Sequence, residues 1–280
     1  MHAAFGAGRN VAYPSPMTSP VTHRAHRPLW PFALLAIAVA LVCAVAAWHP
    51  WTPSSAPDSG ATTDGAAAAV GPAPLVLPEH ARVLIFGDSW TYGAAATELT
   101  DGYAYLVGRA MGWDAVVDGV RGSGYLTPGL GGGDFGERIA ELNPALDPDL
   151  VIVQGSINDR ALYPRGYRDA VAAAWDALIG AYPHAQVVIL GPAPQVLPVE
   201  PATASIDADL AELAAARGWA YVSPIAEQWI TDRDYAWIID TDAGRDHPST
   251  AGHAYLAGRL ADDLRTLEAK TDAAGDSPAP

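Results

Sequence analysis

Short polar clusters along this chain contain serine, asparagine and histidine, the residue types that together can break an ester bond. The first cluster is GDSWTYG at 87–93, and a second, DGVRGSGY, occupies 118–125. A third, GSIND, lies at 155–159, and RDHPSTAGH follows at 245–253. A serine hydroxyl becomes a strong nucleophile when a histidine takes its proton, and N–H donors stabilise the oxyanion that results. The clusters therefore contain the parts of an acyl-transfer site.

Each cluster also has a purely structural interpretation. A serine that follows a strand commonly caps the next helix, because its oxygen accepts a hydrogen bond from a free backbone N–H. Asn158 and Asp159 tolerate turn geometry, and Ser249 or Thr250 suits the start of a helix. The chemical interpretation therefore depends on whether the fold brings the clusters together.

Short apolar runs separate the clusters and are predicted to be β-strands. They are continuous rather than alternating, as expected for parallel strands covered on both faces. The runs lie at 82–86, 114–117, 149–154, 186–190 and 220–223, and helices are predicted at 101–111, 134–142, 165–182, 203–217 and 249–268. This alternation predicts a three-layer, doubly wound α/β/α fold with a mainly parallel sheet built from these runs. Ligands in such folds bind beyond the carboxyl ends of the strands, where the clusters fall.

The order of these blocks resembles that of the SGNH, or GDSL-like, hydrolases. Their hallmarks are GDSxTxG near the first strand, a glycine after the second, GxND after the third and a His-Pro pair near the C-terminus. Here the first block is complete at 87–93, the third is GSIND with one extra residue before the asparagine, and the last is His247-Pro248. The resemblance spans 82–256. It implies a flavodoxin-like fold and a serine esterase that works through an acyl-serine intermediate.

The resemblance also implies a role for each matched residue. Ser89 is expected to be the nucleophile and His247 the general base. The oxyanion donors are expected to be the backbone N–H groups of Ser89 and Gly122 and the side-chain amide of Asn158. Gly124 is the alternative to Gly122, because the sequence alone does not resolve a shift of two residues.

The triad acid departs from the family pattern. The family places an aspartate three residues before the catalytic histidine, and Gly244 occupies that position here. We expect Asp242 to orient His247, with Asp240 or Asp246 as alternatives. A Ser-His dyad oriented by a backbone carbonyl is the other interpretation, since the acid orients the base and does no chemistry itself.

Trp90 directly follows the expected nucleophile and is predicted, with Tyr125, to line the substrate pocket. The glycine-rich stretch at 122–133 lacks the G-x-x-x-x-G-K-[ST] pattern of a phosphate loop. The sequence contains no H-E-x-x-H motif, and a single cysteine, Cys43, cannot form a cysteine-based metal site. Neither a metal nor another cofactor is expected.

The N-terminal part is organised like a membrane anchor. Residues 29–48 carry no charge over about 20 residues, enough to cross a bilayer as a helix. Arg9, Arg24 and Arg27 precede them, so the positive-inside rule predicts that 1–28 are cytoplasmic and the rest of the chain is extracytoplasmic. A cleaved secretory signal is the alternative, because AVA at 44–46 resembles a cleavage site. The protein is then secreted.

The remaining chain divides by composition. Residues 49–78 are rich in Pro, Ala, Ser and Gly, which predicts a linker, and 79–269 are expected to form the hydrolase domain. A polar, disordered tail is predicted at 270–280.

The net charge of the chain limits which classes of partner it is expected to bind. The 16 basic and 31 acidic residues give a net charge of −15, which disfavours nucleic acid. The expected partners are a small-molecule, glycan or lipid ester and, through the anchor, the membrane, while the oligomeric state is not predicted.

An exported position suggests O-acyl groups on cell-envelope glycans or lipids as the substrate. An acyltransferase with the same site, or a non-catalytic glycan-binding module, is the alternative function.

Overall fold

The computed structural model describes residues 72–275, with side chains to residue 268, and contains the predicted parallel sheet. Its strands follow the order β2-β1-β3-β4-β5, and every neighbouring pair is parallel. The strands are β1 (Arg82–Gly87), β2 (Asp114–Gly119), β3 (Leu150–Gln154), β4 (Gln186–Leu190) and β5 (Ala220–Val222). This order is that of flavodoxin-like folds, in which ligands bind where neighbouring strands lead their connections in opposite directions.

The continuous apolar runs arise because both faces of the sheet are buried. Val83 and Ile85 of β1 pack into one hydrophobic core, whereas Leu84 and Phe86 pack into a second core on the opposite face. All four side chains are at most 1 % exposed. Alternate residues therefore stabilise different layers, and neither face of β1 has a place for polar residues.

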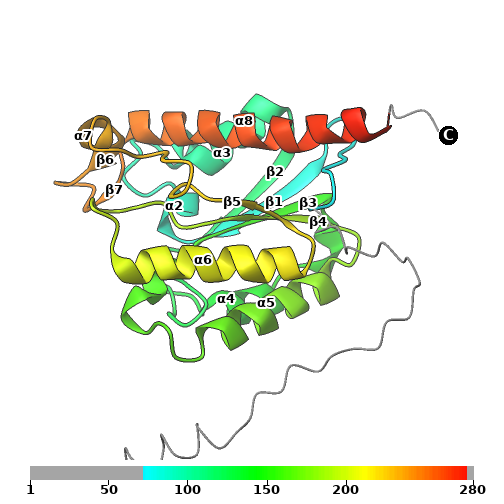
Figure 1. Cartoon of the computed structure of the whole chain (residues 1–280), viewed down its shortest axis with the longest axis horizontal. Coiled ribbons are helices and arrows are strands. Elements are labelled where there is room, and N and C mark those ends of the chain that lie inside the picture. Colours follow the sequence, from blue (N-terminus) through cyan, green and yellow to red (C-terminus); the bar gives the residue numbers. More distant parts are fainter. Residues whose placement is uncertain (1–71, 276–280) are drawn as a thin grey trace, which may run out of the picture. The chain divides into compact units, whose positions relative to one another are not determined.

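Helices cover both faces and complete the predicted three-layer fold (Figure 1). One face is covered by α3 (Tyr103–Met111) and α8 (Thr250–Gly275). The other is covered by α4 (Phe135–Ala140), α5 (Tyr167–Ala181) and α6 (Pro201–Ala216). The predicted helices at these places are therefore confirmed, with shifted ends.

Several short elements were not predicted from the sequence. They are the helices α2 (Ser89–Tyr92) and α7 (Tyr235–Ile238), the 3₁₀ turns η1 (Leu99–Asp101), η2 (Pro144–Leu146) and η3 (Ile157–Ala161), and a two-stranded antiparallel sheet of β6 (Ile239–Asp240) and β7 (His247–Pro248). Each of these elements has at most five residues, too few to show a hydrophobic period. Three of them, α2, η3 and β7, carry the candidate site residues Ser89, Asn158 and His247.

The boundaries of the folded part differ slightly from those predicted. Leu75 is only 5 % exposed, and Val76 N–H donates to Gln186 Oε1 at 2.9 Å, so the packed region begins before residue 79. At the other end α8 continues to Gly275, beyond the predicted boundary at 269.

The predicted anchor at 29–48 and most of the linker at 49–78 lie outside the described residues. Within 72–275, no helix is long and apolar enough to cross a membrane.

Candidate active site

Ser89 lies in the first turn of α2, directly beyond the carboxyl end of β1. Asp88 is the N-cap of this helix, and its Oδ1 accepts a hydrogen bond from Trp90 N–H at 2.9 Å. The capping role therefore belongs to Asp88 and leaves the Ser89 hydroxyl free for another partner. Positions at the start of a helix also leave backbone N–H groups without intrahelical acceptors.

His247 provides that partner. It lies on β7, which pairs with β6 so that His247 stands opposite Asp240. The Nε2 atom of His247 is 2.8 Å from Ser89 Oγ. This is the contact required for a histidine to take the proton of a serine nucleophile. The sheet edge thus brings together two residues that are 158 positions apart in the sequence.

Asn158 and Gly122 lie in the same cleft as Ser89 and His247. Asn158 Nδ2 donates to the carbonyl of Ser123 at 2.9 Å, which fixes the amide and leaves its second N–H to face a ligand. Gly122 has a φ of +78°, a left-handed conformation that favours glycine. No hydrogen bond within 72–275 uses the Gly122 N–H.

Gly124, the alternative donor, does not face the cleft. Its N–H donates to Thr127 O at 2.8 Å, and a Cβ at this position would stand 2.5 Å from Asp159 Oδ1. Asp159 is fully buried and accepts from the N–H groups of Tyr125 and Leu126 at 2.7 and 2.9 Å. Gly124 therefore allows the loop to close over the Asp159 carboxylate, and Gly122 is the better oxyanion donor.

The cleft has a volume of about 270 Å³. Besides the four residues above, its walls come from positions 94–95, 121, 130, 195 and 243–245. Trp90 and Tyr125, which were expected to line the pocket, are absent from these walls and are each 3 % exposed. Trp90 packs into the core beside α3 and α8, and the Tyr125 hydroxyl accepts from Trp175 Nε1 at 2.7 Å. The pocket prediction for these two aromatic residues is therefore wrong.

Comparison with known proteins places the chain in a family. Residues 85–255 match the model of the GDSL-like lipase/acylhydrolase family. The chain belongs to this family. A relative from Mycobacterium tuberculosis, named GDSL lipase Rv0518, is 30 % identical over 200 residues, which cover 67 % of this chain and 84 % of the relative.

Among solved structures of similar fold, two are matched over nearly their whole length. A putative lipolytic protein of the G-D-S-L family from Desulfitobacterium hafniense has a TM-score of 0.53 at 16 % identity, covering 65 % of this chain and 98 % of that one. A Lactobacillus plantarum protein has a TM-score of 0.54 at 19 % identity, covering 68 % and 98 %. At these identities the similarity is one of fold.

The orientation of His247 is where this member of the GDSL-like family departs from the usual pattern. His247 Nδ1 lies 2.9 Å from the carbonyl oxygen of Gly244 and 3.0 Å from that of Arg245. Carbonyl oxygens only accept, so Nδ1 carries the proton and Nε2 is free to accept from Ser89. None of the hydrogen bonds or ion pairs between described residues joins His247 to a carboxylate. The geometry is that of a Ser-His dyad oriented by backbone carbonyls.

Among the described residues, the hydrogen bonds of the His247 ring go to two carbonyls and to Ser89, and none goes to the carboxylate of Asp240, Asp242 or Asp246. Asp240 Oδ1 accepts from Asp242 N–H at 3.0 Å, and Asp240 O accepts from Asp246 N–H at 2.9 Å. The expected role of Asp242 is therefore corrected, as is that of the alternatives Asp240 and Asp246. A Cβ on Gly244 would stand 2.6 Å from Asp240 Cβ and 2.8 Å from Ala95 Cβ, so the family's usual position has no room for a side chain.

Substitutions of these aspartates are expected to have little effect on the reaction. Asp242→Asn and Asp240→Asn each keep kcat/KM for an ester within about threefold of the parent, whereas loss of a true triad acid costs about 10⁴-fold in kcat. Gly244→Asp, which restores the family residue, lowers kcat/KM because its Cβ displaces the loop that holds His247. A fall of several hundredfold in Asp242→Asn would contradict the dyad.

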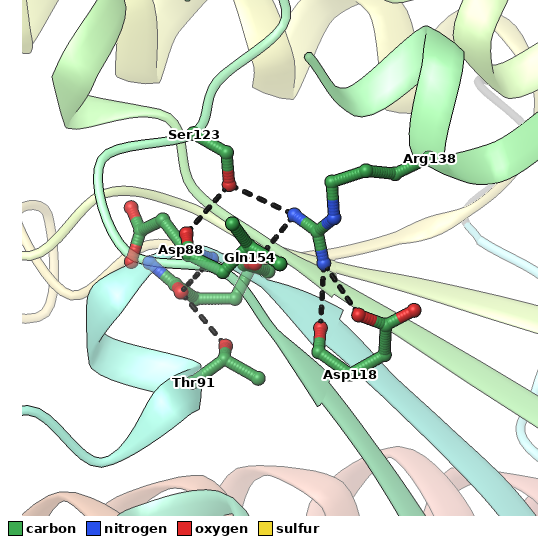
Figure 2. Close-up of polar contacts among 8 residues, drawn as sticks. Asp88, Thr91, Asp118, Ser123, Arg138 and Gln154 are labelled. Carbon is green, nitrogen blue, oxygen red and sulfur yellow. Dashed lines mark hydrogen bonds and ion pairs between the residues drawn. The ribbon is translucent and has the colours of Figure 1, made fainter. Parts of the chain in front are cut away.

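Arg138 of α4 ties together the strand ends that carry the site (Figure 2). It is 6 % exposed, and its Nη1 donates to Gly87 O at 2.9 Å and to Ser123 Oγ at 2.8 Å. Its Nη2 donates to the backbone oxygen and to Oδ1 of Asp118, at 2.9 and 2.7 Å. One guanidinium group therefore connects the residues before Ser89 with the loop that contains Gly122.

His253, the second histidine of the last cluster, has a structural role. It is fully buried; Nδ1 accepts from Tyr103 N–H at 3.2 Å, and Nε2 donates to Ala94 O at 3.0 Å. Burial lowers the pKa of His253, so the ring stays neutral and holds the wall of the cleft at Ala94. Among the described residues no cluster of His, Cys, Asp and Glu could hold a metal ion.

Asp88 is fully buried, and no partner within the described residues reaches its Oδ2. Burial raises the pKa of Asp88 from 3.8 to about 7. Between these values the folded protein holds a proton that the unfolded chain has released, so the free energy of unfolding falls as pH rises through this window. The slope is at most about 1.4 kcal/mol per pH unit, and it levels off above about pH 7.

Asp88→Asn is expected to remove this contribution, because an asparagine keeps the capping oxygen and does not titrate. Urea unfolding of both proteins at several pH values measures it. The free energy of unfolding of the parent minus that of the variant should decrease from pH 4 to pH 7. A difference that does not change with pH would show that Asp88 ionises normally.

Proposed function

We propose that this chain is a carboxylic ester hydrolase that works through an acyl-Ser89 intermediate. The observation that carries the proposal is the 2.8 Å contact between Ser89 Oγ and His247 Nε2, with Nδ1 of the same ring held by two carbonyls. The membership of the GDSL-like lipase/acylhydrolase family supports the same reaction class.

The proposed reaction has two halves. Ser89 Oγ attacks the ester carbonyl while His247 Nε2 takes its proton, and the tetrahedral oxyanion accepts hydrogen bonds from Ser89 N–H, Gly122 N–H and Asn158 Nδ2. The intermediate collapses when His247 returns the proton to the leaving alcohol. A water molecule then gives a proton to His247 and attacks the acyl group. When this second tetrahedral intermediate collapses, His247 returns the proton to Ser89 Oγ and the carboxylic acid is released.

The carbonyls of Gly244 and Arg245 replace the triad acid in this proposal. Each can accept the Nδ1–H of His247 and so keep Nε2 directed at Ser89 Oγ. They carry partial rather than full negative charge, so they stabilise the imidazolium less than a carboxylate does. Correct orientation and tautomer are preserved, which is the larger part of what a triad acid contributes.

The proposed place of action is outside the cytoplasm, on O-acyl groups of envelope glycans or on lipids. The uncharged run at 29–48 and the arginines before it support export. The name of the mycobacterial relative, a GDSL lipase, supports a lipid ester as one substrate class.

The full chain, assayed with 4-nitrophenyl acetate, tests the reaction class. We expect saturable release of nitrophenol that continues well beyond one equivalent per protein molecule. Release no faster than in buffer, with this ester and with a longer-chain one, would overturn the proposal and favour a binding module. Product found as a new ester with added glycerol, rather than as free acid, would identify an acyltransferase.

A further inference from the structure

The charged residues that line the cleft are both arginines. Arg121 and Arg245 stand in its wall, and no aspartate or glutamate is among the lining residues. This is unusual for a chain in which 31 acidic residues outnumber 16 basic ones. A cleft lined by one sign of charge concentrates ligands of the opposite sign.

Neither arginine forms an ion pair within the part of the chain that the structure describes. Both are exposed, and none of the ion pairs between described residues includes either of them. The guanidinium group of Arg121 lies 5.8 Å from the centre of the Tyr92 ring, a contact that leaves its N–H donors free. Most other arginines in the described part do pair with carboxylates, namely Arg82, Arg138, Arg160, Arg168, Arg217, Arg259 and Arg265.

The two arginines lie next to catalytic groups on different segments. Arg121 precedes Gly122, whose N–H is the proposed oxyanion donor, and Arg245 supplies one of the carbonyls that hold His247. A substrate that reaches Ser89 therefore enters a cleft lined by two arginines that have no ion pair within the described residues. Guanidinium pairs readily with carboxylate and phosphate, because its N–H donors match two oxygens at once.

From this we propose that the ester substrate carries a negative charge near its scissile bond, recognised by Arg121 and Arg245. The inference rests on the proposed esterase function and adds a substrate class to it. The anionic group belongs either to the acyl part or to the alcohol part of the ester. An example of the first is a dicarboxylic acid that is esterified at one carboxyl group and free at the other. Both sources present an anion that the same two arginines can bind.

Matched ester pairs test the proposal with the full chain. To test a charge on the acyl part, the anionic ester mono(4-nitrophenyl) succinate is compared with its neutral methyl ester. To test a charge on the alcohol part, the anionic ester 4-acetoxybenzoate is compared with neutral phenyl acetate. After subtraction of the spontaneous rates, at least one charged ester should have a kcat/KM about tenfold above that of its neutral match. Raising the salt concentration should reduce this ratio, because Arg121 and Arg245 are exposed to solvent and salt screens exposed charges.

Arg121→Gln and Arg245→Gln should each lower the charged-to-neutral ratio by about fivefold, the size expected for an exposed ion pair. Arg233→Gln is the control, since Arg233 is also exposed and without an ion pair in the described part, but lies outside the cleft. It should leave the ratio unchanged.

The possible failures are distinguishable. If neutral esters are hydrolysed and neither charged ester is preferred, the charge inference is wrong while the esterase proposal stands. If Arg233→Gln lowers the ratio as much as the cleft variants, the preference comes from overall charge and the assignment to Arg121 and Arg245 is wrong. If no ester is hydrolysed, the esterase proposal itself fails.

Discussion

Ser89→Ala is expected to lower kcat for ester hydrolysis by about 10⁴- to 10⁶-fold, the range in which removal of a serine nucleophile falls. The variant retains the cleft, Gly122 and Asn158, so some catalysis above the rate in water persists from the oxyanion donors. The only hydrogen bond of Ser89 Oγ within the described residues is the one to His247, so the fold loses little stability. Single-turnover and steady-state rates, with circular dichroism as a check on folding, measure the effect.

His247→Ala should reduce kcat by a similar factor, and the Ser89→Ala, His247→Ala double variant should be no slower than either single variant. The two residues act as one unit, because the hydroxyl is a poor nucleophile without the base and the base has nothing to activate without the hydroxyl. Independent effects, in which the double variant loses the product of the two factors, would mean that Ser89 and His247 do not share a step.

Arg138→Met is expected to have the second largest effect, on stability as well as on rate. Removing the guanidinium leaves Gly87 O, Ser123 Oγ and the Asp118 carboxylate without their shared donor. Loss of one partner of a buried ion pair costs about 3–5 kcal/mol, and the partial exposure of Asp118 favours the lower end of this range. The cation–π contact of Arg138 with Phe86, at 4.1 Å from the ring centre, is lost as well.

The rate should fall through kcat rather than through KM. Gly87 and Ser123 lie beside Asp88-Ser89 and Gly122, so loosening them displaces the nucleophile relative to the oxyanion donors. A displacement of about 1 Å costs about 10²-fold. Arg138→Lys keeps the charge without the fork of donors and should recover stability more than kcat. A variant that loses stability but keeps the parental kcat would show that Arg138 is structural only.

Asp118→Asn provides a matched comparison for Arg138→Met. The asparagine retains an oxygen acceptor for Nη2, and the Asp118 backbone carbonyl still accepts from the same nitrogen. Because the guanidinium keeps its other acceptors but loses its counter-charge, we expect a loss of about 1–3 kcal/mol, smaller than that of Arg138→Met, and a kcat close to that of the parent. A larger loss of unfolding free energy would show that the charge of Asp118, rather than the hydrogen-bond geometry of Arg138, provides most of the stabilisation.

The centre of the sheet was predictable because β1, β3 and β4 are buried on both faces. Residues 82–86 and 149–154 are nearly uniformly apolar, and such runs leave few alternatives to central parallel strands. The positions of Ser89 and Asn158 followed, because polar residues at the carboxyl ends of parallel strands meet at one edge of the sheet. His247 lies on β7, outside this sheet, and was expected at the site only through the His-Pro block of the family resemblance.

The pocket prediction failed because adjacent residues of a helix point in different directions. Trp90 follows Ser89 in α2, and a turn of about 100° between them directs the indole into the core. The sequence could not show this, because α2 is too short to display a period. The groups that orient His247 could not be predicted for another reason. Every residue has a backbone carbonyl, so no sequence pattern identifies the carbonyls of Gly244 and Arg245 as the hydrogen-bond acceptors.

Arg138 also lacked a sequence signal of its role. The sequence predicts only a helix at 134–142 around it, and in the structure Asp134 and Glu137 form a capping box at the start of α4. What the guanidinium contacts depends on where this helix packs against β1 and β2. Figure 2 shows the side chain directed at Ser123 and Asp118.

The acyl-enzyme intermediate is the most direct test of this account. The full chain is mixed with 4-nitrophenyl acetate, quenched in acid within milliseconds to seconds, and examined by intact mass and peptide mapping. The account predicts one acetyl group per protein molecule, located on Ser89 and absent from Ser89→Ala. An acetyl group on another residue, or equal labelling of the parent and Ser89→Ala, would contradict it.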